Sequence, residues 1–286
     1  MARLLKGAPA AEALDEKTRL KVERLLASGI EPCLAILRVG EREDDLSYEK
    51  GARKRCEKLG IAVRGIRLPE QVGQERLLSE IHALNADARV HGVLLFRPLP
   101  PHLDEAAICA ALKPEKDVDG ITPASLASVF TGEGPGYPPC TAQSCMELLQ
   151  YYGVEPAGKR AVVIGRSLVV GRPAAMLLME KNATVTLCHS RTKELEKVVQ
   201  EADIVVAALG KCERIDERYL SSGQIVLDVG IHWNEEKGML CGDVAFQRAE
   251  PLVEAITPVP GGVGSVTTSV LASHTARAAE RIGRRE

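Results

Sequence analysis

Apolar and polar positions alternate along the first half of the chain as they do in strands separated by helices. Short apolar or alternating runs predict strands, at 32–39, 61–68 and 92–96. Longer amphipathic stretches predict helices, at 10–27, 48–59 and 74–86. Strands spaced by helical stretches of this length form βαβ units, so we expect a parallel sheet.

A second alternating series follows Thr131 to Pro139, a segment rich in glycine and proline that we interpret as a linker. The series predicts a helix at 143–152, strands at 161–164, 184–187, 204–207 and 225–229, and a final helix at 266–281. We therefore expect two α/β domains, one over residues 1–139 and a second with a parallel sheet over 140–265. We expect the C-terminal helix, within 266–286, to pack back on the first domain.

Composition narrows the class of protein. Apolar residues make up 45% of the 286 residues and aromatic residues only 3%, so the cores must be aliphatic. The 37 basic and 39 acidic side chains nearly balance, which argues against nucleic acid as a partner. No apolar stretch is long enough to cross a membrane, and the N-terminus does not resemble an export signal. We expect a cytoplasmic protein.

The cysteines and histidines predict neither a disulfide framework nor a metal site. The eight cysteines include no CxxC pair, and the six histidines include no HxxxH pair. We expect reduced, mostly buried thiols.

A glycine turn after the strand at 161–164 predicts a phosphate site. The chain continues with Gly165, Arg166 and Ser167, and Gly171 opens a helical run. Small residues let the backbone approach a pyrophosphate, and the N–H groups at the start of the helix face it. The spacing G-x-S-x-x-x-G alone occurs in simple turns, so its place between a strand and a helix carries the prediction.

The end of the next strand indicates which dinucleotide binds. An acidic residue would be expected there if the ribose carried a free 2′-hydroxyl. The chain instead has Ser190 and Arg191, and Arg166 lies in the preceding turn. A hydroxyl and a guanidinium suit a 2′-phosphate, so we expect NADP. The alternative is that both arginines are merely solvated.

Several motifs resemble the methylenetetrahydrofolate dehydrogenase/methenyltetrahydrofolate cyclohydrolase family, of the bacterial bifunctional type. The longest runs from Gly158 to Thr192, and the others keep the family's order between about Leu34 and Thr275. They are Lys116 to Gly120, Pro139 to Thr141, Ala202 to Lys211, Asp228 to Gly230, Gly242 to Val244 and Thr257 to Gly264.

The resemblance implies an N-terminal folate domain, a central Rossmann-type NADP-binding domain and a homodimer. It implies that Tyr48 packs on the folate ring, that Asp119 holds the pterin, and that Pro260, Gly261 and Gly262 approach the substrate. The cofactor would be bound by residues of the second domain, namely Gly165, Arg166, Ser167, Gly171, Ser190, Arg191 and Ile231.

Two positions depart from the family's catalytic pattern. The family has a lysine four residues after the tyrosine, where this chain has Ala52, and a glutamine where this chain has Phe96. The basic residue two positions later is present as Lys54. The candidate catalytic residues are therefore Asp119, Tyr48 and Lys54, with no metal.

The departures affect the two family reactions differently. Hydride transfer from the methylene carbon to NADP needs mainly proximity and orientation. Hydrolysis of the methenyl product needs protons to be moved, and acid–base help of this kind contributes about 10²–10⁴-fold. We therefore predict an NADP-dependent methylenetetrahydrofolate dehydrogenase with weak or absent cyclohydrolase activity.

Three alternatives remain at this point: a bifunctional dehydrogenase/cyclohydrolase, a non-catalytic protein that senses NADP or folate, and a different Rossmann dehydrogenase. The basic run Lys50, Arg53, Lys54 and Arg55 is typical of a solvated helix face. A second hypothesis for this run is that it holds the polyglutamate tail of the folate.

Overall fold

The computed structural model describes residues 1–235 and 238–283, which fold into two compact units. The six-stranded unit contains residues 1–13 and 141–267, and the three-stranded unit contains residues 14–140 and the chain from 268 onward. Both are built from parallel strands and helices, which confirms the α/β fold class. The N-terminal residues fall in the six-stranded unit because β1 (Arg3–Leu4) pairs there with β11 (Ala255–Ile256). The predicted limits of 1–139 and 140–265 for the functional domains stay a prediction.

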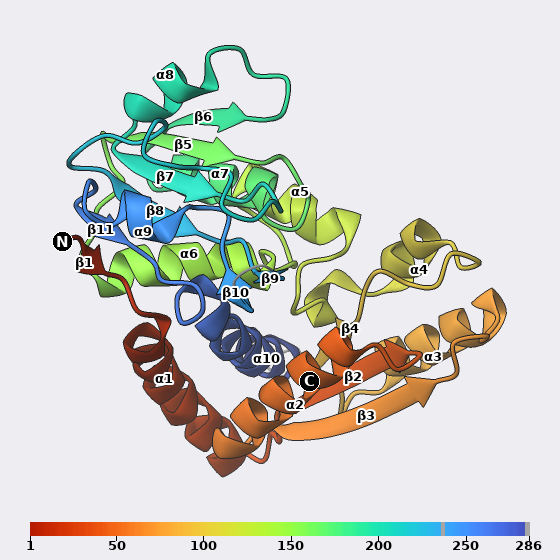
Figure 1. The fold of residues 1–286 in the computed structure, drawn as a ribbon. Coiled ribbons are helices and arrows are strands. Elements are labelled where there is room, and N and C mark those ends of the chain that lie inside the picture. Colours follow the sequence, from red (N-terminus) through yellow and green to blue (C-terminus); the bar gives the residue numbers. More distant parts are fainter. Residues whose placement is uncertain (236–237, 284–286) are drawn as a thin grey trace. The chain divides into compact units, whose positions relative to one another are not determined.

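The three-stranded unit contains a parallel sheet in the order β3-β2-β4. Its strands are β2 (Cys33–Val39), β3 (Ala62–Leu68) and β4 (Gly92–Leu95). Its helices are α2 (Glu43–Lys58), α3 (Gln74–Ala86), α4 (Glu105–Ala111), η1 (Pro114–Lys116), α5 (Pro123–Thr131), most of α1 (Gly7–Ala27) and nearly all of α10 (Thr267–Gly283). Helix α2 packs on β2 and β3 (Figure 1), and the core beneath the sheet is aliphatic.

The six-stranded unit contains a parallel sheet in the order β1-β11-β8-β7-β5-β6. Its remaining strands are β5 (Arg160–Ile164), β6 (Thr184–Cys188), β7 (Ile204–Ala207) and β8 (Ile225–Asp228). Its helices are α6 (Cys140–Tyr151), α7 (Gly171–Glu180), α8 (Leu195–Gln200), α9 (Phe246–Ala249) and η2 (Val263–Ser265). The strands β9 (His232–Asn234) and β10 (Met239–Cys241) form a separate antiparallel pair.

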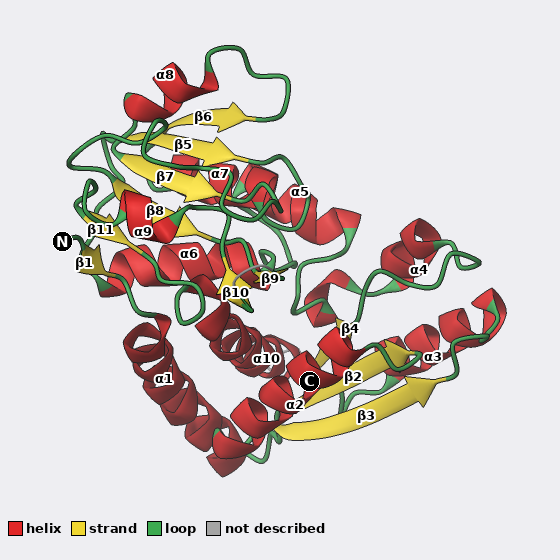
Figure 2. Cartoon of the chain, in the orientation of Figure 1, coloured by secondary structure: helices red, strands yellow, loops and turns green. Residues whose placement is uncertain are grey.

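The strand order of this sheet reverses direction at β5. The chain passes from β5 to β6 on one side and then to β7 on the other side. Figure 2 shows that β5, β6 and β7 all end at the same edge of the sheet, from which their loops leave. In open α/β sheets, ligands bind outside the carboxyl ends of the strands at such a switch point.

The elements predicted from the sequence are all present, with ends that differ by a few residues. The helix predicted from residue 48 begins at Glu43, because three acidic residues of its first turn favour that end of the helix dipole. The sequence analysis did not predict α5, although Thr122 caps it, Pro123 opens it and Gly132 ends it in the left-handed region. Residues 132–139 contain no helix or strand.

Helix α10 belongs to the three-stranded unit, as expected for a C-terminal helix that packs back on the first domain. His274 is buried and its Nδ1 lies 2.9 Å from the Val118 carbonyl oxygen, to which it donates. Arg281 donates to the Pro135 carbonyl oxygen at 3.0 Å, and Glu280 pairs with Lys21 of α1.

The burial of His274 predicts a dependence of stability on pH. Burial lowers the pKa of His274 to about 3. Below pH ~6.5 the unfolded chain therefore binds a proton that the folded chain does not, so stability falls as the pH falls through this window toward about 3. In urea unfolding, we expect the free energy of wild type to fall by about 1.4 kcal/mol more per pH unit between about pH 4 and 6 than that of His274→Asn.

His82→Asn is the control for this measurement, because His82 lies exposed on α3 and should leave the wild-type slope unchanged. Parallel slopes for wild type and His274→Asn would contradict the prediction.

Cys212 and Cys241 form a disulfide bond in the six-stranded unit, with their Cα atoms 6.1 Å apart. The expectation that every cysteine is a reduced thiol is therefore wrong for this pair. The two residues lie 29 positions apart in the sequence and meet only when β10 folds beside the loop after β7, so their spacing gave no signal. The other six cysteines are free thiols.

Candidate functional site

A pocket of about 650 Å³ lies at the switch point of the six-stranded sheet. Its lining comes from the segments that follow β5, β6 and β7, together with the first turn of α8. Of the residues predicted to bind the cofactor, Gly165, Arg166, Ser167 and Ser190 line it. The volume falls within the range of about 300–1,000 Å³ that is typical of small-molecule sites.

The turn after β5 requires its glycines. Gly165 has φ +127°, and a Cβ atom on it would lie 2.0 Å from the Ala208 carbonyl oxygen. A Cβ on Gly171 would lie 2.0 Å from the Gly165 carbonyl oxygen, so the start of α7 packs directly on the turn. Ser167 Oγ accepts from the backbone N–H of Val170 at 3.1 Å, which holds the turn that leads into α7. This backbone cradle suits a phosphate.

The remaining predicted cofactor residues lie outside the lining of this pocket. Gly171 is buried under the turn, Arg191 is exposed and donates its backbone N–H to His189 Nδ1, and Ile231 is 62% exposed before β9. The roles expected for these three residues stay predictions.

Two basic side chains that were not predicted from the sequence, Lys211 and Arg214, also line the pocket. Both follow β7, the neighbour of β5 in the sheet. Because ligands bind at the carboxyl ends of strands, the basic residues after the strand at 204–207 were a usable signal.

Asp243 fixes the loop that carries Lys211. It is fully buried, and its carboxylate accepts from the backbone N–H groups of Leu209 at 2.6 Å, Gly210 at 3.1 Å and Lys211 at 2.8 Å. His232 Nε2 lies 2.8 Å from the same carboxylate. Asp243 therefore holds one wall of the pocket by hydrogen bonds to backbone.

Asp228, at the end of β8, supports Asp243 in turn. It accepts from the backbone N–H groups of Gly230 at 3.1 Å, Asp243 at 2.9 Å and Val244 at 2.9 Å. Burial raises the pKa of Asp228 to about 7, although these hydrogen bonds oppose the shift. Both aspartates therefore hold turns.

The segment with the predicted substrate residues Pro260, Gly261 and Gly262 belongs to the six-stranded unit. The Gly261 carbonyl accepts from the Gly7 backbone N–H at 2.7 Å, and Gly261 has φ +104°. A Cβ on Gly262 would lie 2.5 Å from the Pro258 carbonyl oxygen. These local contacts require both glycines, independently of any substrate.

In the three-stranded unit, Tyr48 and Ala52 occupy one face of α2, because residues four apart lie one above the other on a helix. The Tyr48 ring meets the Phe96 ring edge to face, with centroids 6.0 Å apart. Ala52 is fully buried, so the two family positions that differ in this chain are both part of packed apolar surface. Lys54 is exposed and six residues from Tyr48, which places it on another face of α2.

Asp119 lies beside the segment that follows β4. Asp117, two residues earlier, pairs with Val93 of β4 in a parallel bridge. The segment from Asp117 to Asp119 therefore runs beside β4 in the same direction, toward Phe96 and Arg97. Burial raises the pKa of Asp119 to about 6, whereas its hydrogen bond with the Cys140 thiol and the nearby Arg97 lower it.

The neighbours of Asp119 have structural roles. Burial keeps the pKa of the Cys140 thiol well above its usual value, so Cys140 is a hydrogen-bonding thiol rather than a thiolate nucleophile. Asp117 accepts from the backbone N–H groups of Ile121 at 2.9 Å and Thr122 at 2.8 Å, and from Ser125 Oγ at 2.6 Å. It fixes the loop that presents Asp119.

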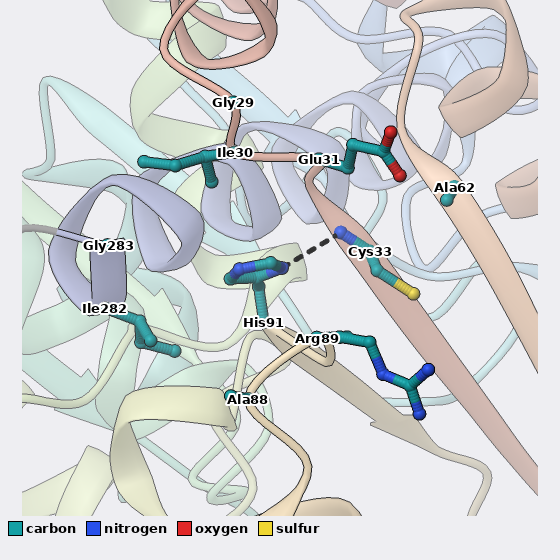
Figure 3. A pocket seen from close by; sticks show the side chains of 10 residues that line it. All are labelled: Gly29, Ile30, Glu31, Cys33, Ala62, Ala88, Arg89, His91, Ile282 and Gly283. Atoms are coloured by element: carbon teal, nitrogen blue, oxygen red, sulfur yellow. Dashed lines mark hydrogen bonds between the residues drawn. The ribbon is translucent and has the colours of Figure 1, made fainter. Parts of the chain in front are cut away.

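A second cavity, of about 390 Å³, lies at the amino ends of β2 and β3. Figure 3 shows the His91 imidazole at its centre, where Nδ1 accepts from the Cys33 backbone N–H at 3.2 Å. Arg89 and Glu31 also line it. The strands point away from this cavity, so it lies at the opposite edge of the sheet from Phe96.

Within residues 1–235 and 238–283, no group of three or more histidine, cysteine, aspartate or glutamate side chains is placed to hold a metal ion. None of the helices in this part of the chain is long and apolar enough to cross a membrane.

Two family descriptions match the chain. Residues 5–119 match the catalytic domain of tetrahydrofolate dehydrogenase/cyclohydrolase, and residues 139–283 match the NAD(P)-binding domain of the same family. A curated relative from Carboxydothermus hydrogenoformans, named bifunctional protein FolD, is 50% identical over 98% of both chains. A relative of the same name from Alkaliphilus oremlandii is 49% identical over 97% of both chains.

Solved structures agree with this match. The bifunctional methylenetetrahydrofolate dehydrogenase/cyclohydrolase from Campylobacter jejuni superposes with a TM-score of 0.95 and 37% identity, covering 98% of this chain and 99% of that one. The methylenetetrahydrofolate dehydrogenase-cyclohydrolase from Trypanosoma brucei, solved with NADP and an inhibitor, has a TM-score of 0.92 and 36% identity, with 99% of both chains covered.

Proposed function

Because the chain belongs to the tetrahydrofolate dehydrogenase/cyclohydrolase family, we propose that it is an NADP-dependent methylenetetrahydrofolate dehydrogenase. The observation that carries the choice of cofactor is the pocket at the switch point. Ser190 lines it after β6, where an enzyme specific for NAD would place an acidic residue, and Arg166 adds a guanidinium from the turn after β5. NADP, when bound, supplies the hydride acceptor.

The six-stranded unit fits this cofactor without a metal. The turn from Gly165 to Gly171 offers backbone N–H groups and no side chain in the way of a pyrophosphate. Arg166 offers a guanidinium to the 2′-phosphate, and Ser190 a hydroxyl. The work of these residues is to bind and orient the dinucleotide, which is the main requirement of hydride transfer.

The three-stranded unit supplies the residues for the folate. Tyr48 is half-buried and held by the Phe96 ring, so its own ring is oriented to pack on a flat heterocycle. The Asp119 carboxylate can accept from two adjacent N–H donors of a pterin. Because burial raises the pKa of Asp119 to about 6, this recognition requires a pH above that value.

We propose hydrolysis of methenyltetrahydrofolate as the second function of the chain. Relatives with 50% and 49% identity are named bifunctional, which supports the bifunctional alternative over the expectation of weak or absent cyclohydrolase activity. Ala52 and Phe96 carry no titratable group, so the lysine of the family pattern has no equivalent at its position.

A paired assay on the purified protein tests both functions. Methylenetetrahydrofolate with NADP should yield the methenyl compound, and methenyltetrahydrofolate alone should be hydrolysed faster than in buffer. Oxidation without enhanced hydrolysis would overturn the second function and leave the first. Failure to oxidise the substrate would overturn the first.

The hypothesis that the basic face of α2 holds a polyglutamate tail gives a separate prediction. We propose that Lys54, which is exposed, contacts the carboxylates of this tail. Lys54→Ala should raise KM for a polyglutamylated substrate by about threefold to tenfold, because one exposed ion pair contributes roughly 1 kcal/mol, and should leave KM for the monoglutamate unchanged. Lys17→Ala removes an exposed lysine from a different helix, α1, and is the control. Equal changes for both substrates would contradict the role.

A homodimer and a cytoplasmic location, both predicted from the sequence, complete the proposal. Sedimentation of the full chain would test the first, because a dimer of a 30.8 kDa chain is easily separated from its monomer.

A further inference from the structure

The pocket at the switch point carries three basic side chains without acidic partners. Arg166, Lys211 and Arg214 line it, and none of them forms an ion pair within residues 1–235 and 238–283. The two acidic side chains of the lining are engaged, since Glu194 pairs with Lys197 and Glu196 accepts a hydrogen bond from Tyr219. A hydrogen bond from a neutral phenol leaves the charge of Glu196 in place, so the lining carries three positive charges against this one and is positive overall.

Arg214 differs in this respect from the arginines closest to it. Arg218, four residues later, pairs with Asp216 at 2.9 Å, and Arg248 pairs with the same carboxylate at 3.4 Å. Both lie outside the pocket lining. Arg214 alone of these three arginines faces the pocket.

The backbone around Arg214 is held on both sides. The Glu213 N–H donates to the Gly242 carbonyl oxygen at 2.8 Å, and the Ile215 N–H donates to the Asp243 carbonyl oxygen at 2.9 Å. The Ile215 side chain is fully buried. The backbone of Arg214 is therefore already fixed before a ligand binds. Binding then costs less conformational entropy than it would for an arginine on an unrestrained loop.

The position of Arg214 within the pocket indicates which phosphate it would meet. The turn between β5 and α7 offers its backbone N–H groups to the pyrophosphate. Arg214 lies close enough to Tyr219 to lower the pKa of that hydroxyl, which hydrogen-bonds Glu196 in the first turn of α8. Helix α8 begins five residues after Ser190, so Arg214 lies toward the end of the pocket that Ser190 lines.

We propose that Arg214 binds the 2′-phosphate of NADP together with Arg166 and so determines the preference for NADP over NAD. The inference deepens the proposed function and rests on it. A guanidinium can make two parallel hydrogen bonds to a phosphate, and Arg166 and Arg214 both line this pocket, from the segments after the neighbouring strands β5 and β7.

Binding of adenosine fragments to the full-length protein tests this role without the folate reaction. The probes are 2′,5′-ADP, which carries the 2′-phosphate, and 5′-AMP, which lacks it. Arg214→Ala should raise Kd for 2′,5′-ADP by about tenfold or more, the loss expected for a charged hydrogen bond, and change Kd for 5′-AMP by less than about twofold. Arg214→Lys should recover only part of the loss, because an ammonium lacks the planar pair of donors.

Two variants make the outcome decisive. Arg218→Ala removes the same charge four residues away and should leave both Kd values unchanged. Arg166→Ala should lose selectivity for 2′,5′-ADP. If Arg166→Ala loses selectivity and Arg214→Ala does not, or if Arg214→Ala weakens both probes equally, the role of Arg214 is wrong and the proposed function stands. If wild type does not prefer 2′,5′-ADP, the NADP specificity fails and the role of Arg214 with it.

Discussion

Replacing Ala52 with lysine should raise the rate of methenyltetrahydrofolate hydrolysis by at least about 10²-fold, the lower end of the range for general acid–base catalysis. Position 52 lies one helical turn after Tyr48 on the same face of α2, so a side chain there extends beside the ring that we expect to pack on the folate. Because Ala52 is fully buried, desolvation should lower the pKa of the new lysine toward neutral.

The pH dependence of this gain has a defined sign. Only the neutral amine accepts a proton, so the added hydrolysis should increase as the pH rises through the pKa of the lysine and level off above it. Hydride transfer to NADP should change little, because it needs no base.

Ala52→Met is the matched control, since methionine adds similar length without an amine. The double variant Ala52→Lys with Phe96→Gln should exceed the single variant, because an amide can hold the amine where the Phe96 ring cannot. Thermal unfolding of each variant separates a loss of fold from a loss of activity. If Ala52→Lys hydrolyses no faster than Ala52→Met, the interpretation of position 52 is wrong.

Replacing Asp243 with alanine should lower the free energy of unfolding by at least about 3 kcal/mol, because each buried polar group left without a partner costs about 1–3 kcal/mol. The carboxylate accepts from three consecutive backbone N–H groups and is itself fully buried, so no water replaces it easily. The same variant should raise KM for NADP more than tenfold, because the released loop carries Lys211 and leads to Arg214.

Asp203→Ala is the control for this effect. Asp203 is exposed and accepts from the Arg160 backbone N–H at 2.7 Å, so its loss should cost about 1 kcal/mol or less. Urea unfolding and NADP-dependent kinetics together check the prediction. An Asp243→Ala protein with the stability loss of Asp203→Ala, or with an unchanged KM, would contradict the account of the loop.

For the predicted folate residues, the sequence motif identified the positions but not their contacts. The departures at positions 52 and 96 were visible from spacing alone, and a regular helix places Tyr48 and Ala52 on one face. The contact between the Tyr48 and Phe96 rings was not visible, because it joins α2 to the segment after β4 across 48 residues of sequence. The family motif identified these residues in the sequence, but their shared apolar surface is seen only in the tertiary structure.

The sequence by itself determined the local elements of the cofactor site. A buried strand, the turn from Gly165 to Gly171 and the helix that follows are encoded within one continuous segment, Arg160 to Glu180, because hydrophobic periodicity and backbone freedom act over such short distances. The tertiary structure decided how the segment after β7 is held against the pocket. Arg214 reaches the pocket because Gly242 and Asp243 hold its backbone, and Cys212 meets Cys241 for the same reason. Such contacts depend on the order of strands in the sheet, which no local pattern of residues specifies.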